Sequence, residues 1–420
     1  MSTLIKSAKI VDPGSKNHLQ KKNILIDENG IIKKISSESA KAKTVIEGSD
    51  LHVSIGWFDM KANFNDPGLE QKEDLNTGRL AAAAGGFTEV ALVPNTNPVI
   101  QSKNDVKYLQ SGNKNELVQL HAIGAITKNC QGEDLTEMID MHHAGAVAFS
   151  DGNKPIWNTD ILLKTLQYLQ KFDGLLINLP EDKYLTFFGT MHEGPTSTML
   201  GLKGIPSLSE ELIVKRDLKL LDYAGGKIHF SNISTRDALK IIKKAKQKDK
   251  NATCDVAVTH LLFDDRILVE YDSNFKVNPP LREEKDKKAL LRGLMDEVID
   301  VIVSSHEPHD EECKKLEFDL ADFGMATIQT FFPMLLRATN NKDWIDLIPK
   351  FTTNPRKILG MEIPEIKTGE AANLTVFDPG ELWSLDATNN FSRSKNSPFY
   401  NQQLKGKAVA VINNGHVFQW

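Results

Sequence analysis

Short apolar runs alternate with longer amphipathic segments through the middle of the chain. The segments between the runs show helical periodicity, as in NTDILLKTLQYLQKF and SEELIVKRDLKLLDYAGG. The apolar runs have the β-branched and aromatic composition of buried strands, and they read HVSIGWFDM, FTEVALVP, VQLHAIGAI, GAVAFS, GLLINL, KIHFSNI, CDVAVTH and DVIVSS. Eight strand–helix units with nearly continuous apolar strands predict an α/β fold, a parallel (β/α)8 barrel of the TIM type.

The two ends of the chain have a different pattern. TLIKSAKIV and NILIDENGIIKKI near the start, and ANLTVFDPG and KAVAVINNGHVFQW near the end, are short runs separated by turn signals. This pattern predicts strands at both ends. We therefore expect residues 1–52 and 366–420 to form one small β-sandwich domain, and residues 53–365 to form the barrel domain.

Composition excludes several classes of function. The 51 basic and 56 acidic residues give a net charge of −5, whereas a nucleic-acid-binding surface is normally basic. No run of about 18 apolar residues is present, so no membrane span is expected. The start, MSTLIKSAKIVDPGS, lacks the pattern of a signal peptide, and the three cysteines are too few and scattered for a disulfide framework. These features predict a cytoplasmic protein without nucleic-acid or membrane partners.

Polar side chains follow the predicted strands, where barrel active sites lie. Lys61 and Asn63 are two residues apart and therefore point to the same side of the first strand. A metallohydrolase would place histidines there, but an ammonium has no lone pair for a metal ion. The other polar residues near the strand ends are Asn65, Asn95, Asp151, Asn232, Asn278, Ser305, His306 and His309.

Longer motifs in the chain resemble those of dihydroorotases of the amidohydrolase superfamily. The resemblance covers nearly the whole chain and rests on DPG, AAAAGGFTEVALVPNTNP, GTMHEGPTSTMLGLKGIP, VNPPLR, TTNPRKILGM and NSPFYNQQLKGKAVAVINNG. It implies a (β/α)8 barrel beside a β-sandwich built from both termini. It also implies the zinc-dependent interconversion of N-carbamoyl-L-aspartate and dihydroorotate, a step of pyrimidine biosynthesis.

The chain departs from the family at the positions that carry this chemistry. Lys61, Asn63 and Asn65 stand where the family has two metal-binding histidines and a substrate-binding arginine. The family's other lost groups, two histidines and an aspartate that is both ligand and general base, fall at Leu179 (Asn178 if the register shifts by one), Asn232 and Ser305. The bridging acid is kept as Asp151. Because metal and base are both needed for the hydrolysis, the departures predict a pseudoenzyme without a metal ion.

Other residues keep the family's identity. Asn95, Asn278 and His309 match positions that contact substrate, so together with Asp151 they form a candidate residual anion pocket; packing and loop hydrogen bonds are the simpler interpretation. We expect His229 to be a hydrogen-bonded core residue, and His142 and His143 to lie on the surface. We also expect Lys61 to replace the metal charge through a salt bridge to Asp151, since an unpaired buried carboxylate is costly.

Three functions remain open from the sequence. The first is a non-catalytic dihydroorotase homologue that binds aspartate transcarbamoylase and supports its assembly, with a homo-oligomer as a further possible association. The second is an active cyclic-amide hydrolase with one metal ion on Asp151, His306 and His309. The third is a metabolite-sensing or structural protein that retains a pocket for a pyrimidine intermediate.

Overall fold

Eight parallel strands form the central sheet of the protein. The structure is a computed structural model, and it describes residues 2–38, 40–248 and 251–420. The order β15-β14-β13-β10-β9-β8-β7-β6 follows the chain, so each strand lies beside its sequence neighbour. The strands are β6 (Trp57–Ala62), β7 (Phe87–Leu92), β8 (Gln119–Gly124), β9 (Ala148–Phe149), β10 (Leu176–Asn178), β13 (Ile228–Phe230), β14 (Ala252–Ala257) and β15 (Val301–Val303). The predicted (β/α)8 barrel is therefore confirmed.

The first and last barrel strands meet and nearly close the sheet. Ala62 forms a parallel bridge with His306, and the Asn63 N–H donates to the His306 carbonyl at 2.9 Å. One level below, the Asp59 carboxylate accepts from the Ser304 N–H at 3.1 Å and from the Ser304 hydroxyl. This seam brings the end of the first strand next to the end of the eighth, which places Lys61 and Ser305 in one region.

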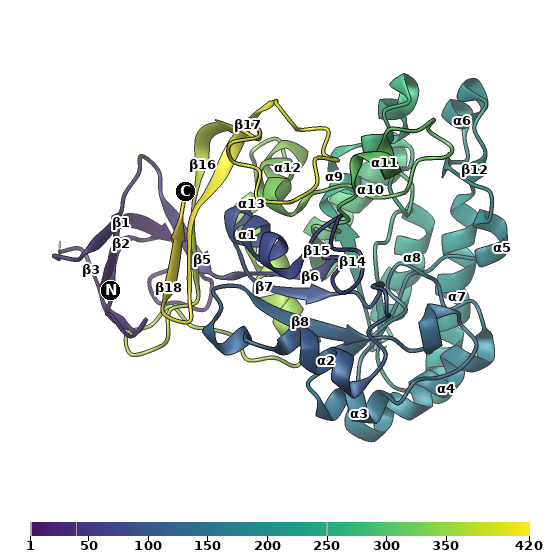
Figure 1. Ribbon diagram of the computed structural model, residues 1–420, viewed down its shortest axis with the longest axis horizontal. Helices are drawn as coiled ribbons and strands as arrows, with labels where there is room; N and C mark the ends of the chain where they lie inside the picture. Colours follow the sequence, from purple (N-terminus) through teal and green to yellow (C-terminus); the bar gives the residue numbers. More distant parts are fainter. Residues whose placement is uncertain (1, 39, 249–250) are drawn as a thin grey trace.

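Helices surround the barrel on its outer side (Figure 1). The apolar cluster between strands and helices is the larger part of the core, and the barrel interior holds a smaller cluster that includes Phe58, Met60 and Ile177. The helices are α1 (Leu75–Gly85), α2 (Lys103–Gln110), α3 (Met138–His143), α4 (Thr159–Leu169), α5 (Lys183–Thr186), α6 (Pro195–Leu200), α7 (Ser207–Ala224), α8 (Arg236–Lys246), α9 (Val258–Leu262), α10 (Glu284–Met295), α11 (Glu311–Lys314), α12 (Phe331–Ala338), α13 (Trp344–Leu347) and α14 (Thr353–Ile358).

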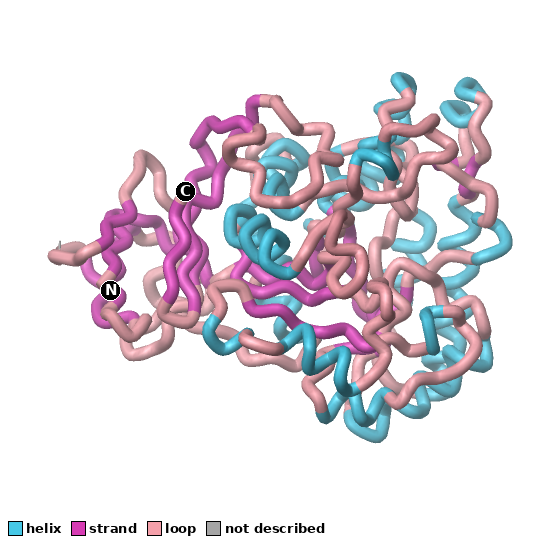
Figure 2. The backbone as a smooth tube through the Cα atoms, in the orientation of Figure 1, coloured by secondary structure: helices cyan, strands magenta, loops and turns pink. Residues whose placement is uncertain are grey.

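Strands from both ends of the chain form a second sheet beside the barrel, seen at the left of Figure 2. The order is β18-β17-β16-β5-β1-β2-β3, with β4 paired to β1, so the C-terminal strands join the N-terminal strands through the β16–β5 pair. A separate apolar cluster covers this sheet. Its strands are β1 (Thr3–Ile10), β2 (Lys21–Ile26), β3 (Ile32–Ser36), β4 (Thr44–Ile46), β5 (His52–Ile55), β16 (Leu374–Ser384), β17 (Gln403–Asn413) and β18 (His416–Gln419). A small two-stranded sheet, β11 (Met191–His192) and β12 (Gly204–Ile205), lies apart from both.

The run HVSIGWFDM supplies one strand to each sheet. Gly56 separates β5 from β6, and a Cβ atom there would lie 2.0 Å from Asn373 Oδ1 and 2.1 Å from Thr88 Oγ1. The close approach of these side chains requires glycine and divides the run. The predicted limit between residues 52 and 53 falls inside β5, which pairs with β1 and β16. The domain limits themselves stay a prediction. In the described residues, no helix is long and apolar enough to cross a membrane.

Candidate functional site at the barrel mouth

The strand ends at the barrel mouth keep an unusual backbone conformation. Asn65, Asn232 and Ser305 have φ values of 60°, 55° and 52°, in the left-handed region. Asparagine enters this region several-fold more readily than most residues, whereas serine has no such advantage. Such backbone conformations cost energy and persist only where the surrounding structure enforces them. They are found most often at functional sites. Three of the positions that the sequence assigned to the lost chemistry therefore retain the local geometry of a site.

Lys61 occupies the middle of the barrel mouth. With the Asn232 amide oxygen facing the ammonium, Lys61 Nζ donates to it at 3.0 Å, and Ser305 Oγ donates to the same oxygen at 2.9 Å. The Asn232 amide nitrogen then donates to Asp255 Oδ1 at 3.3 Å, and the Asn232 backbone N–H donates to the same carboxylate at 2.6 Å. Three positions that the resemblance assigns to metal binding or base catalysis are thus joined directly to one another.

The charges around Lys61 are carboxylates, those of Asp59 and Asp255 on buried residues and that of Glu307 on a half-buried one. Burial lowers the pKa of Lys61, and the carboxylates of Asp255, Glu307 and Asp59 oppose this effect. Burial also raises the pKa of Asp59 and of Glu307 to about 7, each from a much lower ordinary value. An ammonium among several acids balances their charge, and it does so at the place where a metal ion would act.

The predicted salt bridge between Lys61 and Asp151 is wrong. Asp151 is buried, and its carboxylate accepts from the N–H groups of Ile126 and Thr127, at 3.0 and 2.9 Å, and from the Thr127 hydroxyl. Its charged neighbour is Lys154. Burial raises the pKa of Asp151, while the Thr127 and Ile126 hydrogen bonds lower it. The loop after β8 thus satisfies the carboxylate without a metal ion or Lys61.

The other altered positions have structural partners. Asn63 Oδ1 accepts from the Asn65 N–H at 2.9 Å, and the Asn65 amide donates to the Pro308 carbonyl at 3.2 Å. Leu179 is buried just after β10. Asn178, the alternative for that position, donates to Asp217 Oδ2 at 2.6 Å. These contacts stabilise the loops at the mouth, and the hydrocarbon side chain of Leu179 has no lone pair to offer a metal ion.

The candidate residual pocket is not assembled as one cavity. Asn95 holds the loop after β9, since its amide donates to the Asp151 carbonyl at 3.0 Å and its oxygen accepts from the Asn153 N–H at 2.7 Å. Asn278 donates to Glu181 at 2.9 Å and borders a cavity of about 10 Å³. His309 borders a different cavity, of about 360 Å³, outside the barrel mouth. The packing interpretation thus accounts for Asn95.

Little free volume remains beside Lys61. The cavities that it lines measure about 10 Å³ or less, which is at most enough for a single water molecule. Pockets that hold small organic ligands usually measure about 300–1,000 Å³. In the described conformation, the barrel mouth has no room for a pyrimidine intermediate.

The residues at the barrel mouth do not fit the zinc ions that the resemblance implies. A zinc ion needs three or four nitrogen, sulfur or oxygen ligands, and here Asp151 is already engaged while Lys61 brings a positive charge into the centre. Nor does the single-metal set form. His306 Nδ1 accepts from the Thr327 N–H at 3.0 Å, and the described residues contain one group of three close metal-type ligands, which includes His309 but neither Asp151 nor His306.

The remaining histidines behave as the sequence predicts. His229 is fully buried, with Nδ1 2.7 Å from Thr253 Oγ1 and Nε2 2.9 Å from Asp255 Oδ2. His142 and His143 are exposed on α3. His260 follows β14 and lies in α9, where burial lowers its pKa to about 4.

Sequence reasoning missed the acids that accompany Lys61. Asp255 stands within the predicted apolar strand CDVAVTH, and Glu307 follows the eighth predicted strand, so neither was assigned a role. Glu307 accepts from the Asn153 amide at 2.7 Å. An acidic residue within a run as apolar as CDVAVTH was the available signal, because a buried carboxylate requires a partner.

Comparisons with known proteins identify the family of this chain. A family model described as "Dihydro-orotase-like" matches residues 51–238. A protein named "Dihydroorotase" from Pelotomaculum thermopropionicum is 37% identical over 420 residues, covering 99% of this chain and 98% of the relative. Another with the same name, from a Geobacter species, is 38% identical over 421 residues and covers 99% of both chains.

The fold is also found among solved structures. The L-hydantoinase (dihydropyrimidinase) from Arthrobacter aurescens superposes with a TM-score of 0.84 over 99% of this chain and 95% of that one, at 21% identity. This likeness supports the fold alone. The identity to the relatives named dihydroorotase extends over the full length of the described barrel and terminal sheet. The chain therefore belongs to the dihydroorotase-like family of amidohydrolases.

Proposed function

We propose that this protein is a catalytically inactive dihydroorotase-like protein of pyrimidine biosynthesis, which acts as a non-catalytic partner of aspartate transcarbamoylase. The observation that carries the inactivity is the ammonium of Lys61 at the centre of the barrel mouth, 3.0 Å from Asn232. Both residues stand where the family's metal ligands would be.

The chemistry of the reaction explains why these changes matter. Hydrolysis of a cyclic amide needs an activated water and a group that polarises the carbonyl, and a metal ion provides both in metallohydrolases. It also needs a base, and Ser305 stands in place of the family's aspartate. The small cavities beside Lys61 remove the room for substrate as well. The barrel mouth therefore offers no cavity that would support the hydrolase or the metabolite-sensor alternative.

An exposed aromatic surface supports a role in association. We define it as Tyr184, Phe187 and Phe188, which are 72%, 66% and 67% exposed. Aromatic side chains carry about 150–250 Å² each, so this surface offers about 300–500 Å², and a stable interface needs about 800 Å² from each partner. Lys203 lies 4.6 Å from the Phe188 ring. The surface fits the core of an interface with an apolar partner patch that has acidic residues at its edge.

Two measurements test this proposal. Purified protein should hydrolyse dihydroorotate no faster than buffer, with or without added zinc. Co-expression with the transcarbamoylase of the same organism should give one co-eluting complex, which Phe187→Glu or Phe188→Glu weakens. Leu320→Glu is the matched control, because Leu320 is equally exposed, at 63%, and lies outside the aromatic surface.

Each part can fail separately. Turnover that disappears on chelation would refute the inactivity. Separate elution of the two proteins at micromolar concentration would refute the partnership. Should the protein alone be a dimer that Phe188→Glu dissociates, the aromatic surface would belong to a homo-oligomer and would no longer support the transcarbamoylase contact.

A further inference from the structure

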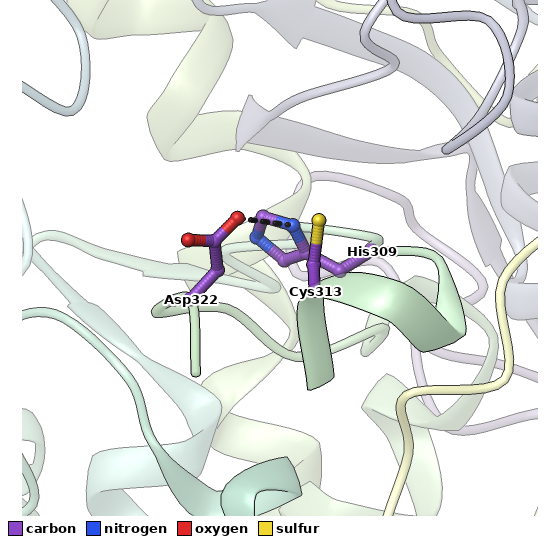
Figure 3. Close-up of side chains that lie close together, drawn as sticks. All are labelled: His309, Cys313 and Asp322. Atoms are coloured by element: carbon purple, nitrogen blue, oxygen red, sulfur yellow. Dashed lines mark ion pairs between the residues drawn. The ribbon is translucent and has the colours of Figure 1, made fainter. Parts of the chain in front are cut away.

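Three metal-type ligands lie together on the segment that follows β15. The ligand atoms of His309, Cys313 and Asp322 are all within 4.8 Å of one another, and no other such group is found in residues 2–38, 40–248 and 251–420. Figure 3 shows the imidazole, the thiol and the carboxylate facing a common point. None of the three corresponds to a metal-ligand position that the resemblance assigns.

The histidine is held in the orientation that a ligand requires. His309 Nε2–H donates to the Phe323 carbonyl at 2.8 Å, so the lone pair is on Nδ1. Nδ1 lies 3.6 Å from Asp322 Oδ2, on the side of the cluster. A carbonyl that fixes the second ring nitrogen is the usual outer-shell partner of a metal-binding histidine.

The segment is closed by its own backbone, which fixes the spacing of the cluster. The Glu307 N–H donates to the Met325 carbonyl at 2.9 Å, and the Asp322 N–H donates to the Cys313 carbonyl at 3.0 Å. Gly324 packs against His309, since a Cβ atom there would lie 2.7 Å from the imidazole ring. The ligands are therefore brought together by the folded segment rather than by chance contact of mobile side chains.

A cation already lies in the cluster. Lys72 Nζ donates to His309 Nδ1 at 3.0 Å and lies 3.4 Å from Asp322 Oδ2. The groups around it thus present acceptors to a positive charge. Lys72 is partly exposed, with 14% of its side chain accessible, so the ammonium has a route to solvent.

We propose that His309, Cys313 and Asp322 form a zinc site in which the Lys72 ammonium occupies the metal position until zinc displaces it. Imidazole, thiolate and carboxylate are the ligands that zinc prefers, and three of them leave the fourth position to water. Binding requires Cys313 to lose its proton to solvent, because the thiolate is the ligand. Zinc ligands lie about 3–4 Å apart for bonds of about 2.0–2.3 Å, so small side-chain rotations complete the site.

The site is tested by zinc titration of chelator-treated, full-length protein. We expect about one zinc ion per chain. Cys313→Ser and Asp322→Asn should each weaken binding at least about tenfold, whereas Lys72→Met should tighten it, because no ammonium then competes. Asp319→Asn is the matched control, an exposed acid on the same segment that should leave the affinity unchanged.

Cobalt gives an independent readout. Cobalt-loaded protein should show a thiolate-to-metal charge-transfer band that Cys313→Ser abolishes, while circular dichroism verifies that the variant is folded. Absence of zinc binding, or zinc binding that Cys313→Ser and Asp322→Asn leave unchanged, would overturn the site. Binding that only Asp151→Asn removes would place the metal at the barrel mouth, and it would count against the proposed inactivity as well.

Discussion

Lys61 and Asn232 face each other across the barrel mouth, with the ammonium 3.0 Å from the amide oxygen. Both stand at positions where the family resemblance places metal-binding histidines. The ammonium brings one positive charge to a region that contains the carboxylates of Asp255, Glu307 and Asp59. The chain itself therefore supplies the cation that balances these carboxylates. Removing this cation should change the free energy of unfolding.

Lys61→Met should destabilise the protein in a pH-dependent way. At pH 8 the buried carboxylates lose their cation, and breaking a buried charge arrangement costs about 3–5 kcal/mol. At pH 5 we expect a smaller cost, since Asp59 and Glu307, each with a pKa of about 7, are then neutral. Urea unfolding at both pH values measures the difference. Exposed Lys342→Met is the control, and an equal loss at both pH values would contradict the charge-balance account.

The free energy of unfolding of Glu307→Gln should rise relative to that of the wild type as the pH rises. Burial raises the folded-state pKa of Glu307 from 4.5 to about 7, so the folded state binds its proton more tightly than the unfolded state. The wild type therefore loses stability between about pH 4.5 and 7, by up to about 3 kcal/mol at 1.36 kcal/mol per pKa unit. The glutamine variant lacks this loss.

The measurement is the difference in unfolding free energy between Glu307→Gln and wild type from pH 4.5 to 8. Histidines such as His260, whose pKa is about 4 in the folded state and near 6.5 in the unfolded chain, also change the stability in this range, and their contribution cancels in the difference. Exposed Glu362→Gln should give a flat difference. A flat difference for Glu307→Gln as well would show that burial does not control this carboxyl group.

The sequence predicted the barrel strands because they are buried on both faces. β7 (FTEVAL) and β14 (ATCDVA) are mostly apolar and buried nearly throughout, and the apolar pattern needs no knowledge of tertiary contacts. Helix α2 was missed, because its sequence KNDVKYLQ buries only Val106 and Leu109 and is otherwise polar. The division between β5 and β6 at Gly56 depends on Thr88 and Asn373, which are distant in the sequence.

The identity of the site residues could be read from the sequence, whereas their partners could not. Lys61 was expected at the mouth and is there, but its partner is Asn232 rather than Asp151. Asp151 is satisfied by Thr127, on the loop after a neighbouring strand. Which of two groups reaches a carboxylate depends on loop shape and rotamer, and neither appears in a pattern of residue types. Of the proposed zinc ligands, His309 and Cys313 are close in the sequence, whereas Asp322 joins them only through closure of the loop.

Glu89 and Arg356 should contribute strongly to stability below the barrel mouth. Arg356 is fully buried and donates to Glu89 Oε1 at 3.1 and 2.6 Å through Nε and Nη2. Burial alone would raise the pKa of Glu89, but Arg356 and His121 lower it to about 2. Stability from this group is therefore present above about pH 4.5 and is lost as the pH falls toward 2.

Glu89→Gln should cost about 3–5 kcal/mol at pH 7, because it leaves the Arg356 guanidinium buried without its countercharge. The cost should shrink as the pH falls toward 3. Unfolding by urea at several pH values measures it. Asp160→Asn is the control, since the exposed Lys164–Asp160 pair is expected to contribute less than about 1 kcal/mol. A cost for Glu89→Gln that stays constant with pH would show that its charge is not the stabilising element.

Restoring histidine at the first strand should not restore hydrolysis. In the variant Lys61→His with Asn63→His, the remaining positions Asn232 and Ser305 still lack a ligand and a base. Removing the Lys61 ammonium also leaves Asp255 and Glu307 without their cation, which disfavours the folded barrel mouth. Dihydroorotate hydrolysis by this variant with added zinc should equal the buffer control, while circular dichroism reports whether it folds. Turnover that a chelator abolishes would mean that two ligands are enough, and that loss of catalysis rests on the first strand alone.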